Sequence, residues 1–171
     1  MKHLYFVRHG LSEMGKSGLR AGAGTETLLA PEGHEQAQRA GHHARTLDID
    51  HIISSPQKRA HHTAQIIAHE IGFPEKDIVL NSLFVERHFG ELEGVRWEAD
   101  MNIDGFADVE TTDTLLHRMH LAYEFLRSLP FDNVLVVSHG STGRALRHII
   151  HPEIPFHGSE PFENGQIVQL I

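Results

Sequence analysis

The sequence lacks several features that would place it in whole classes of protein. It contains no cysteine, which excludes a disulfide framework, a thiolate metal site and a cysteine nucleophile. No apolar stretch approaches the roughly 20 residues of a membrane-spanning helix. The N-terminal segment MKHLYFVRHG has too short an apolar run for a signal peptide. These absences predict a soluble, cytoplasmic protein with no membrane partner.

Positive charge is also scarce. There are 15 Lys and Arg residues against 23 Asp and Glu, so the formal net charge is −8. A general nucleic-acid or anionic-membrane surface needs a positive footprint, and this balance argues against one. A local basic pocket remains compatible with this charge balance.

The 171 residues suffice for one domain with a substantial core, and we expect a single domain over residues 1–171.

Histidine is abundant, with 16 residues, and invites a metal-site interpretation. The spacings do not favour it. No HExxH motif occurs, and HEQAQ at 34–38 lacks the second histidine. The adjacent pairs at 42–43 and 61–62 would point in different directions on a helix. We therefore expect no metal site, and most of these histidines on the surface.

Short runs rich in β-branched or aromatic residues alternate along the chain with amphipathic helical patterns. This alternation predicts an α/β fold, a three-layer α/β/α sandwich with a mostly parallel central sheet. The C-terminal segment GQIVQLI is predicted to form a last strand, at the edge of the sheet, after the Asn-Gly turn at 164–165. Strands are predicted at 3–7, 51–54 and 133–138, and helices over 31–47, 56–72, 112–129 and 141–150.

Two helices carry more specific expectations. The helix from residue 141 starts with Ser141 and Thr142, which are suitable N-caps after a strand. Two stretches, 15–26 and 99–113, do not fit the alternation of strands and helices, and they are predicted to be loops near the substrate entrance. The helix from residue 112 places one set of side chains on a buried face, namely Leu115, Met119, Ala122, Tyr123 and Leu126.

One motif occurs twice. VRHGLS at 7–12 and VSHGST at 137–142 both end an apolar strand with His-Gly and continue into a hydroxyl residue. In a parallel sheet the ligand crevice lies outside the carboxyl ends of the strands, so His9 and His139 should meet if their strands are neighbours. Gly10 and Gly140 remove the Cβ where the backbone turns or approaches a ligand. Two histidines in matched contexts favour a functional site over two chance surface positions.

Charged residues follow the same strand ends. Arg8 adds a permanently charged fork of donors that suits phosphate or carboxylate, and Arg59 begins the helix after the second strand. Glu86 comes directly after apolar residues in FVERHFGELEG. A carboxyl group in a partly desolvated pocket can be held protonated and give its proton to a leaving oxygen. Taken singly, Arg59 could equally be a solvated helix cation and Glu86 an ion-pair partner.

These residues lie in five blocks that occur in order from about residue 3 to residue 148. Together they resemble the histidine phosphatase superfamily, in its phosphoglycerate-mutase-like branch. A lone RHG is a weak signal, whereas five blocks in sequence are specific. The blocks are Arg8-His9-Gly10, L-x-x-x-G-x-x-Q-A at 29–37, S-S-P-x-x-R-A-x-x-T-A at 54–64, E-R-x-F-G-x-x-E-G at 86–94 and V-V-S-H-G at 136–140.

The resemblance implies a mechanism. By similarity, His9 is a nucleophile that becomes phosphorylated, while Arg8, Arg59 and His139 surround the phosphoryl group and stabilise its charge. Glu86 acts as general acid and then as general base. A carbonyl near Gly10 would fix the histidine tautomer. No metal or other cofactor is required. The resemblance and the local pattern also nominate Ser12, Gly140 and Arg87 for phosphate or substrate binding.

The chain departs from the family pattern in its first block. Many relatives read R-H-G-x-T-x-x-N, with the Asn contributing to the phosphate pocket, whereas Ser12 and Gly15 stand at the Thr and Asn positions here. Another group, such as Ser12 or a backbone N–H of the Gly-rich loop, would then fill the pocket. Ala30 stands where Thr is usual, and we expect this change to cost a helix cap at most.

Two enzyme activities share all of these residues. We favour a phosphatase acting on a phosphorylated small molecule. The alternative is a mutase, which must retain a bisphosphate, and the E-R-H-F-G block resembles the mutase version. The predicted lid at 98–113 has no Lys or Arg and would repel a bisphosphate. Its acidic residues are Glu98, Asp100, Asp104, Asp108, Glu110 and Asp113.

Two further interpretations stay open. A non-catalytic phosphate-binding module would have lost the nucleophile or the acid, and neither is lost here. A phosphoprotein could replace the small-molecule substrate, because selectivity lies in loops whose conformation the sequence does not determine. The oligomeric state is equally undetermined by the sequence.

Overall fold

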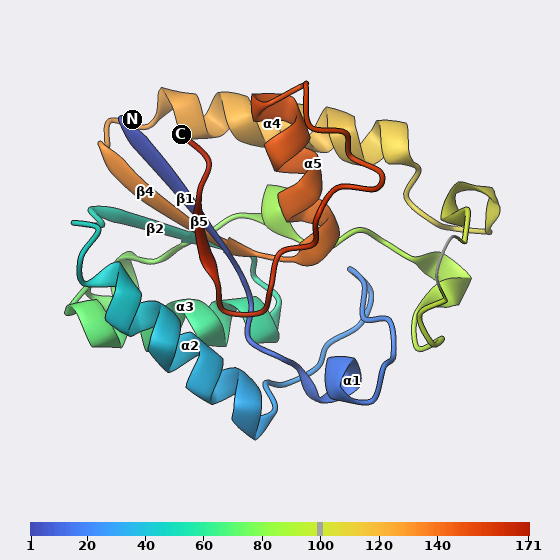
Figure 1. The fold of residues 1–171 in the computed structure, drawn as a ribbon, viewed down its shortest axis with the longest axis horizontal. Helices are drawn as coiled ribbons and strands as arrows, with labels where there is room; N and C mark the ends of the chain where they lie inside the picture. Colours follow the sequence, from blue (N-terminus) through green and yellow to red (C-terminus); the bar gives the residue numbers. More distant parts are fainter. Residues whose placement is uncertain (99–100) are drawn as a thin grey trace.

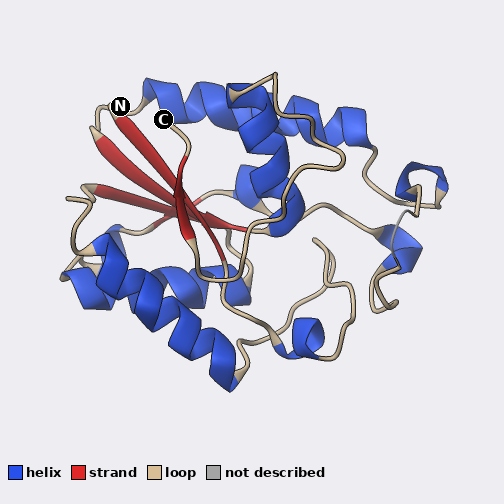
Figure 2. Ribbon diagram, in the orientation of Figure 1, coloured by secondary structure: helices blue, strands red, loops and turns tan. Residues whose placement is uncertain are grey.

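The computed structural model describes residues 1–98 and 101–171. Its centre is a five-stranded sheet with helices on both faces (Figures 1 and 2). The strand order is β3-β2-β4-β1-β5, in which β5 alone runs antiparallel, at the edge beside β1. The predicted three-layer α/β architecture is thus confirmed. The strands are β1 (His3–Arg8), β2 (His51–Ser54), β3 (Val79–Leu80), β4 (Asn133–Ser138) and β5 (Ile167–Gln169).

The helices divide into two layers. In Figure 1, α2 and α3 lie below the sheet and α4 and α5 above it, and each layer encloses its own apolar core against the strands. Short 3-10 turns occupy Glu75–Asp77, Ser82–Phe84, Gly90–Leu92 and Ile103–Gly105. The α-helices are α1 (Glu13–Lys16), α2 (Pro31–Ala44), α3 (Lys58–Ile71), α4 (Thr112–Ser128) and α5 (Gly140–Ile150).

The buried face predicted for α4 is confirmed. Leu115, Met119, Ala122 and Leu126 are fully buried, and Tyr123 is half-buried against the same core. Gly72 ends α3 with a left-handed φ of 71°, a conformation that glycine adopts without a steric penalty. No helix within the described residues is both long and apolar enough to cross a membrane.

Some helix boundaries differ from the prediction. The capping role predicted for Ser141 and Thr142 is wrong, because α5 begins at Gly140 and both residues lie inside its first turn. His139 occupies the N-cap position with an extended backbone, φ −130° and ψ 173°, and makes no side-chain cap bond. β4 ends one residue earlier, at Ser138, so the chain turns into the helix directly. Ala30 likewise caps α2 without a side-chain bond, as expected.

The predicted loops are partly structured. α1 overlaps the start of the 15–26 stretch, and the remainder is irregular. Within 99–113, residues 99–100, which include Asp100, lie outside the described residues. Thr112 and Asp113 already belong to α4, because Thr111 caps that helix by accepting the N–H of Thr114. The short β3 strand was not predicted; its residues are exposed and too few for a periodic signal.

Candidate active site

Two adjacent parallel strands bring the two histidines together. Arg8 at the end of β1 pairs in register with Ser138 at the end of β4, so His9 and His139 leave the sheet side by side. Their ring centroids are 5.1 Å apart. The predicted convergence of the two His-Gly motifs is confirmed.

His9 is held in a single tautomer. Its Nδ1 lies 2.7 Å from the carbonyl oxygen of Gly10, which can only accept, so Nδ1 carries the proton and Nε2 keeps its lone pair. The side chain is only 7% exposed. Burial, with Arg59 and Arg8 nearby, lowers the pKa of His9 well below its usual value. His9 is therefore neutral at neutral pH, the state that a nucleophile requires.

The loop that carries His9 is fixed by two residues to which the sequence analysis assigned no role at the site. Thr63 Oγ1 accepts the N–H of Gly10 at 3.1 Å, and Asn164 Nδ2 donates to the His9 carbonyl at 2.7 Å. A Cβ on Gly10 would lie 2.2 Å from the carbonyl oxygen of Gly33 in α2. Gly10 is thus required because the backbone passes close to α2. From the sequence we had expected a backbone turn or an approach to a ligand as the reason for this glycine.

His139 is held by a hydroxyl group. It is fully buried, and its Nε2 lies 2.8 Å from Ser55 Oγ. Since Ser55 Oγ already accepts the N–H of Gln57 at 3.3 Å, its proton is free to point at His139 Nε2. His139 Nδ1 is buried without a hydrogen-bond partner among the described residues, and it carries the proton when Ser55 donates to Nε2. Burial and Arg59 lower the pKa of His139 well below its usual value.

The two predicted phosphate-binding arginines are anchored by backbone carbonyls, Arg8 through Nη1 and Arg59 through both Nη1 and Nη2. Arg8 Nη1 donates to the Phe162 carbonyl at 3.1 Å, and Arg59 Nη1 donates to the Thr25 carbonyl at 2.9 Å. The Nε of each is buried with no partner among the described residues. Burial lowers the pKa of each guanidinium, and Glu86 raises it. The positive charges of Arg59 and Arg8 both lower the pKa of His9.

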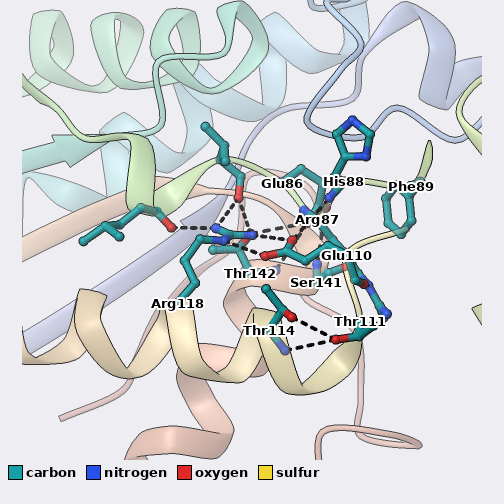
Figure 3. Close-up of polar contacts among 12 residues, drawn as sticks. Glu86, Arg87, His88, Phe89, Glu110, Thr111, Thr114, Arg118, Ser141 and Thr142 are labelled. Carbon is teal, nitrogen blue, oxygen red and sulfur yellow. Dashed lines mark hydrogen bonds and ion pairs between the residues drawn. The ribbon is translucent and has the colours of Figure 1, made fainter. Parts of the chain in front are cut away.

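Glu86 sits at the N-terminus of α5. Its carboxylate accepts the N–H groups of Ser141 and Thr142, each at 3.3 Å, and the hydroxyl of Thr142 at 3.3 Å (Figure 3). The carboxylate therefore does the capping that we had expected of Ser141 and Thr142 themselves, and it interacts favourably with the helix dipole. Glu86 is 7% exposed.

The segment after Glu86 is tied to the acidic stretch. Arg87 pairs with Asp104 and donates from Nε to the Glu110 carbonyl at 2.7 Å. Arg118 of α4 binds both carboxylate oxygens of Glu110 at 2.8 Å (Figure 3). Arginines outside the 98–113 segment thus pair with two of its acidic residues, Asp104 and Glu110, and the predicted repulsion of a bisphosphate by this segment stays a prediction.

Two cavities adjoin the site. The smaller, of about 190 Å³, is lined by Arg8, Glu86 and Gly140. The larger, of about 540 Å³, is lined by aromatic side chains, by Asp104 and by three arginines. Both are also lined by Trp97, Ser141 and Arg144, so they join at these residues. The arginines of the larger cavity are Arg20, Arg87 and Arg144.

Ser12 and Gly15 interact with each other. Ser12 Oγ accepts the N–H of Gly15 at 3.1 Å and so caps α1. A Cβ on Gly15 would lie 3.2 Å from that oxygen. The Ser12 hydroxyl proton is not committed by this bond, so its role in phosphate binding stays a prediction. No group of three or more His, Asp or Glu side chains within the described residues is placed to hold a metal ion.

Comparison with known proteins supplies a family match. The model of the histidine phosphatase superfamily (branch 1) matches residues 4–170. The chain is 32% identical to a probable phosphoglycerate mutase, GpmB, of Escherichia coli, over 82% of this chain and 70% of the relative. It is also 32% identical to a probable phosphatase of Schizosaccharomyces pombe, over 78% of this chain and 51% of the relative.

The fold has close structural counterparts. A phosphoglycerate mutase structure from Bacillus anthracis superposes with a TM-score of 0.84 at 18% identity, covering 98% of this chain and 86% of that one. The chain spans 39% and 51% of the length of two curated relatives that it matches.

Proposed function

Because the chain belongs to the histidine phosphatase superfamily (branch 1), we propose that it is a phosphatase that hydrolyses a phosphate monoester through a phosphohistidine on His9. The observation that carries this proposal is the 2.7 Å contact between His9 Nδ1 and the Gly10 carbonyl, in a site where burial keeps the ring neutral. We further propose that residues 1–171 act as one domain, in the cytoplasm.

In the first step, the lone pair of His9 Nε2 attacks phosphorus, and the bond between phosphorus and the alcohol oxygen breaks. The leaving oxygen takes a proton from Glu86, so the alcohol departs neutral. Arg8 and Arg59 each have a free Nε in the site, and these donors are proposed to stabilise the equatorial phosphoryl oxygens. Gly140 lines the same cavity as Arg8 and Glu86, and its proposed role in substrate binding is through this position.

In the second step, the ionised Glu86 takes a proton from water as the water oxygen attacks the phosphohistidine. The bond between phosphorus and Nε2 breaks, inorganic phosphate leaves, and His9 returns to its neutral state. His139 is proposed to donate its Nδ1 proton to a phosphoryl oxygen in both steps, because this proton has no protein partner among the described residues.

Hydrolysis is favoured over phosphoryl transfer between two positions of one substrate. Only 52 residues (139 − 86 − 1) separate Glu86 from His139, which leaves little chain for a lid that would exclude water from a phosphohistidine. One observation favours the mutase as a second candidate, namely the arginines that line the larger cavity. Incubation with 3-phosphoglycerate, with and without a bisphosphate primer, separates the two. Primer-dependent isomerisation without phosphate release would overturn the hydrolase proposal.

The nucleophile is tested by substitution. We expect His9→Ala to lower turnover of para-nitrophenyl phosphate by at least about a thousandfold, because the covalent route is lost. Brief incubation of the wild-type protein with a radiolabelled phosphate ester should leave an acid-labile, alkali-stable label that His9→Ala lacks. His43→Ala, at an exposed position in α2, is the matched control.

Unchanged turnover by His9→Ala would refute the assigned nucleophile. Phosphate-ester binding without any turnover by the wild-type protein would instead favour the non-catalytic module. A phosphorylated small molecule is the proposed substrate, and a screen of such metabolites for released phosphate identifies its class. If the protein cleaves phosphopeptides but none of the small molecules, a phosphoprotein would replace a small molecule as the proposed substrate.

A further inference from the structure

Arg144 occupies the junction between the two cavities. It lies five residues after His139, within the first half of α5, and its side chain is half-buried. It lines the smaller cavity together with Arg8 and Glu86, and it lines the larger cavity together with Arg87. A molecule whose phosphoryl group reached Arg8 and whose remainder filled the larger cavity would therefore pass this guanidinium.

The described residues leave the Arg144 guanidinium without a polar partner. Within residues 1–98 and 101–171 it makes no hydrogen bond or ion pair, and its Cζ lies 5.5 Å from the centroid of the Phe156 ring. Nearby arginines are occupied: Arg87 pairs with Asp104, and Arg147 donates to the Glu160 carbonyl at 2.6 Å. A half-buried guanidinium that lines both cavities can therefore offer its donors to an anionic ligand.

The charges around Arg144 are mainly positive. Burial lowers its pKa, Glu86 raises it, and Arg8, Arg147 and Arg87 lower it further. Guanidinium groups stay protonated at ordinary pH despite such shifts. Arg20, Arg87 and Arg144 line the larger cavity with Asp104 and Glu98, and Asp104 is already paired with Arg87. Arg144 is therefore placed to bind an anion in addition to the reacting phosphoryl group.

Resting on the proposed function, we infer that Arg144 binds a second anionic group, a carboxylate or a phosphate, on the leaving alcohol of the substrate. The planar fork of Arg144 matches either group. Trp97 lines both cavities and is 54% exposed, so its ring provides an apolar wall for the carbon skeleton between the two anions. The substrate is then an organic phosphate with an anionic leaving group.

A matched substrate pair tests this inference. In 3-phosphoglycerate the leaving group carries a carboxylate, and in glycerol 3-phosphate a neutral hydroxymethyl group stands in its place. We expect Arg144→Gln to lower the ratio of kcat/KM for 3-phosphoglycerate over glycerol 3-phosphate by about 10- to 100-fold, as for loss of hydrogen bonds to a charged group. The same measurement of kcat/KM with propane-1,3-diol bisphosphate in place of 3-phosphoglycerate shows whether Arg144 prefers a phosphate to a carboxylate as the second anion.

Two control variants complete the design. Arg144→Lys keeps the charge and should retain part of the ratio, which excludes misfolding as the cause of the loss. Arg147→Gln removes a neighbouring arginine on the same helix that lines neither cavity, and it should leave the ratio unchanged. An unchanged ratio in Arg144→Gln, or an equal fall in Arg147→Gln, would overturn the inference.

Direct binding separates this inference from the proposed reaction. Calorimetric titration of 3-phosphoglycerate and glycerol 3-phosphate into the wild-type protein and Arg144→Gln reports on Arg144 even without turnover. Selective binding that requires Arg144, with no phosphate released, refutes the hydrolase and retains the anion site. Phosphate release with equal affinity for both compounds refutes the anion site and retains the hydrolase.

Discussion

The side-chain oxygen of Gln57 accepts the backbone N–H of Glu86 at 2.9 Å. The other end of the same amide donates to the Gly22 carbonyl at 2.8 Å, and Arg59 also donates to that carbonyl, at 3.2 Å. Gln57 is buried between the β2–α3 turn, the Gly-rich loop and the segment that carries Glu86. It therefore positions the proposed general acid relative to one of the phosphate-binding arginines.

Replacement of Gln57 by Leu should displace Glu86 without removing any group that contacts substrate. It keeps a similar volume but leaves the Glu86 N–H unpaired, which costs about 1–3 kcal/mol of stability, while the Gly22 carbonyl keeps its bond from Arg59. We expect a fall in kcat of about tenfold or more at unchanged KM. Steady-state kinetics and urea denaturation measure both effects. Gln38→Leu, on the exposed side of α2, should change neither.

Replacement of Glu86 by Gln should affect poor leaving groups most. An alkyl alcohol needs a proton as it departs, whereas para-nitrophenolate does not, so the fall in kcat should be roughly 100- to 10,000-fold for an alkyl phosphate and much smaller for the aryl ester. Comparison of the two substrates in the same variant measures this difference. Equal losses with both esters would mean that Glu86 acts mainly by capping α5.

Stability should fall at mildly acidic pH. The pKa values of His9 and His139 are well below 6.5 in the folded protein because both rings are buried beside arginines. The unfolded chain then binds more protons than the folded one below pH 6.5, so the free energy of unfolding decreases as pH falls through this range. Between pH 7.5 and 5.5 each buried histidine contributes a loss of roughly 1.4 kcal/mol.

Urea denaturation at the two pH values measures the loss. The double variant His9→Asn, His139→Asn should lose less stability over the same interval, because two of the titrating groups are gone. A wild-type curve that is flat from pH 7.5 to 5.5 would contradict buried neutral imidazoles. In the same range, kcat/KM should not decline through pH 6.5, since the attacking nitrogen stays unprotonated.

Removal of Arg118 should loosen the segment that leads to Glu86. Arg118 Nη1 donates to the carbonyls of Leu83 and Val85 at 2.6 and 2.9 Å, in addition to its bonds to Glu110. Arg118→Met keeps the aliphatic stem but leaves the Leu83 carbonyl without a donor and removes the cation paired with the Glu110 carboxylate, so we expect a loss of about 2–4 kcal/mol. Thermal denaturation measures it, and Arg127→Met on the exposed part of α4 is the control.

The main strands and the site residues on them could be predicted from the sequence. The runs at 3–8, 51–54 and 133–138 are apolar over several consecutive residues, and such runs form buried parallel strands whatever surrounds them. His9 and His139 follow strands of this kind, and the carboxyl ends of parallel strands lie at the same edge of the sheet. Their proximity therefore followed from local pattern and one rule of topology.

The contacts that hold the site could not be predicted in this way. The cap of α5 comes from Glu86, which is 54 residues (140 − 86) before the helix, and local sequence showed only Ser141 and Thr142. Gln57 and Thr63 lie on the turn and helix after β2, where polar residues are usually solvated, and their partners Glu86 and Gly10 are distant in sequence. Such contacts depend on how three elements pack, which no local pattern encodes.

The amino-acid sequence by itself determined the fold class, the pair of histidines and the set of charged residues at the strand ends, because these depend on hydrophobic periodicity and chain order. Only the tertiary structure decided the tautomer of His9, the pairing of Asp104 and Glu110 with arginines, and the unengaged guanidinium of Arg144. Hydrogen bonds and ion pairs act over a few ångströms between residues far apart in the chain, so they exist only once the layers have packed.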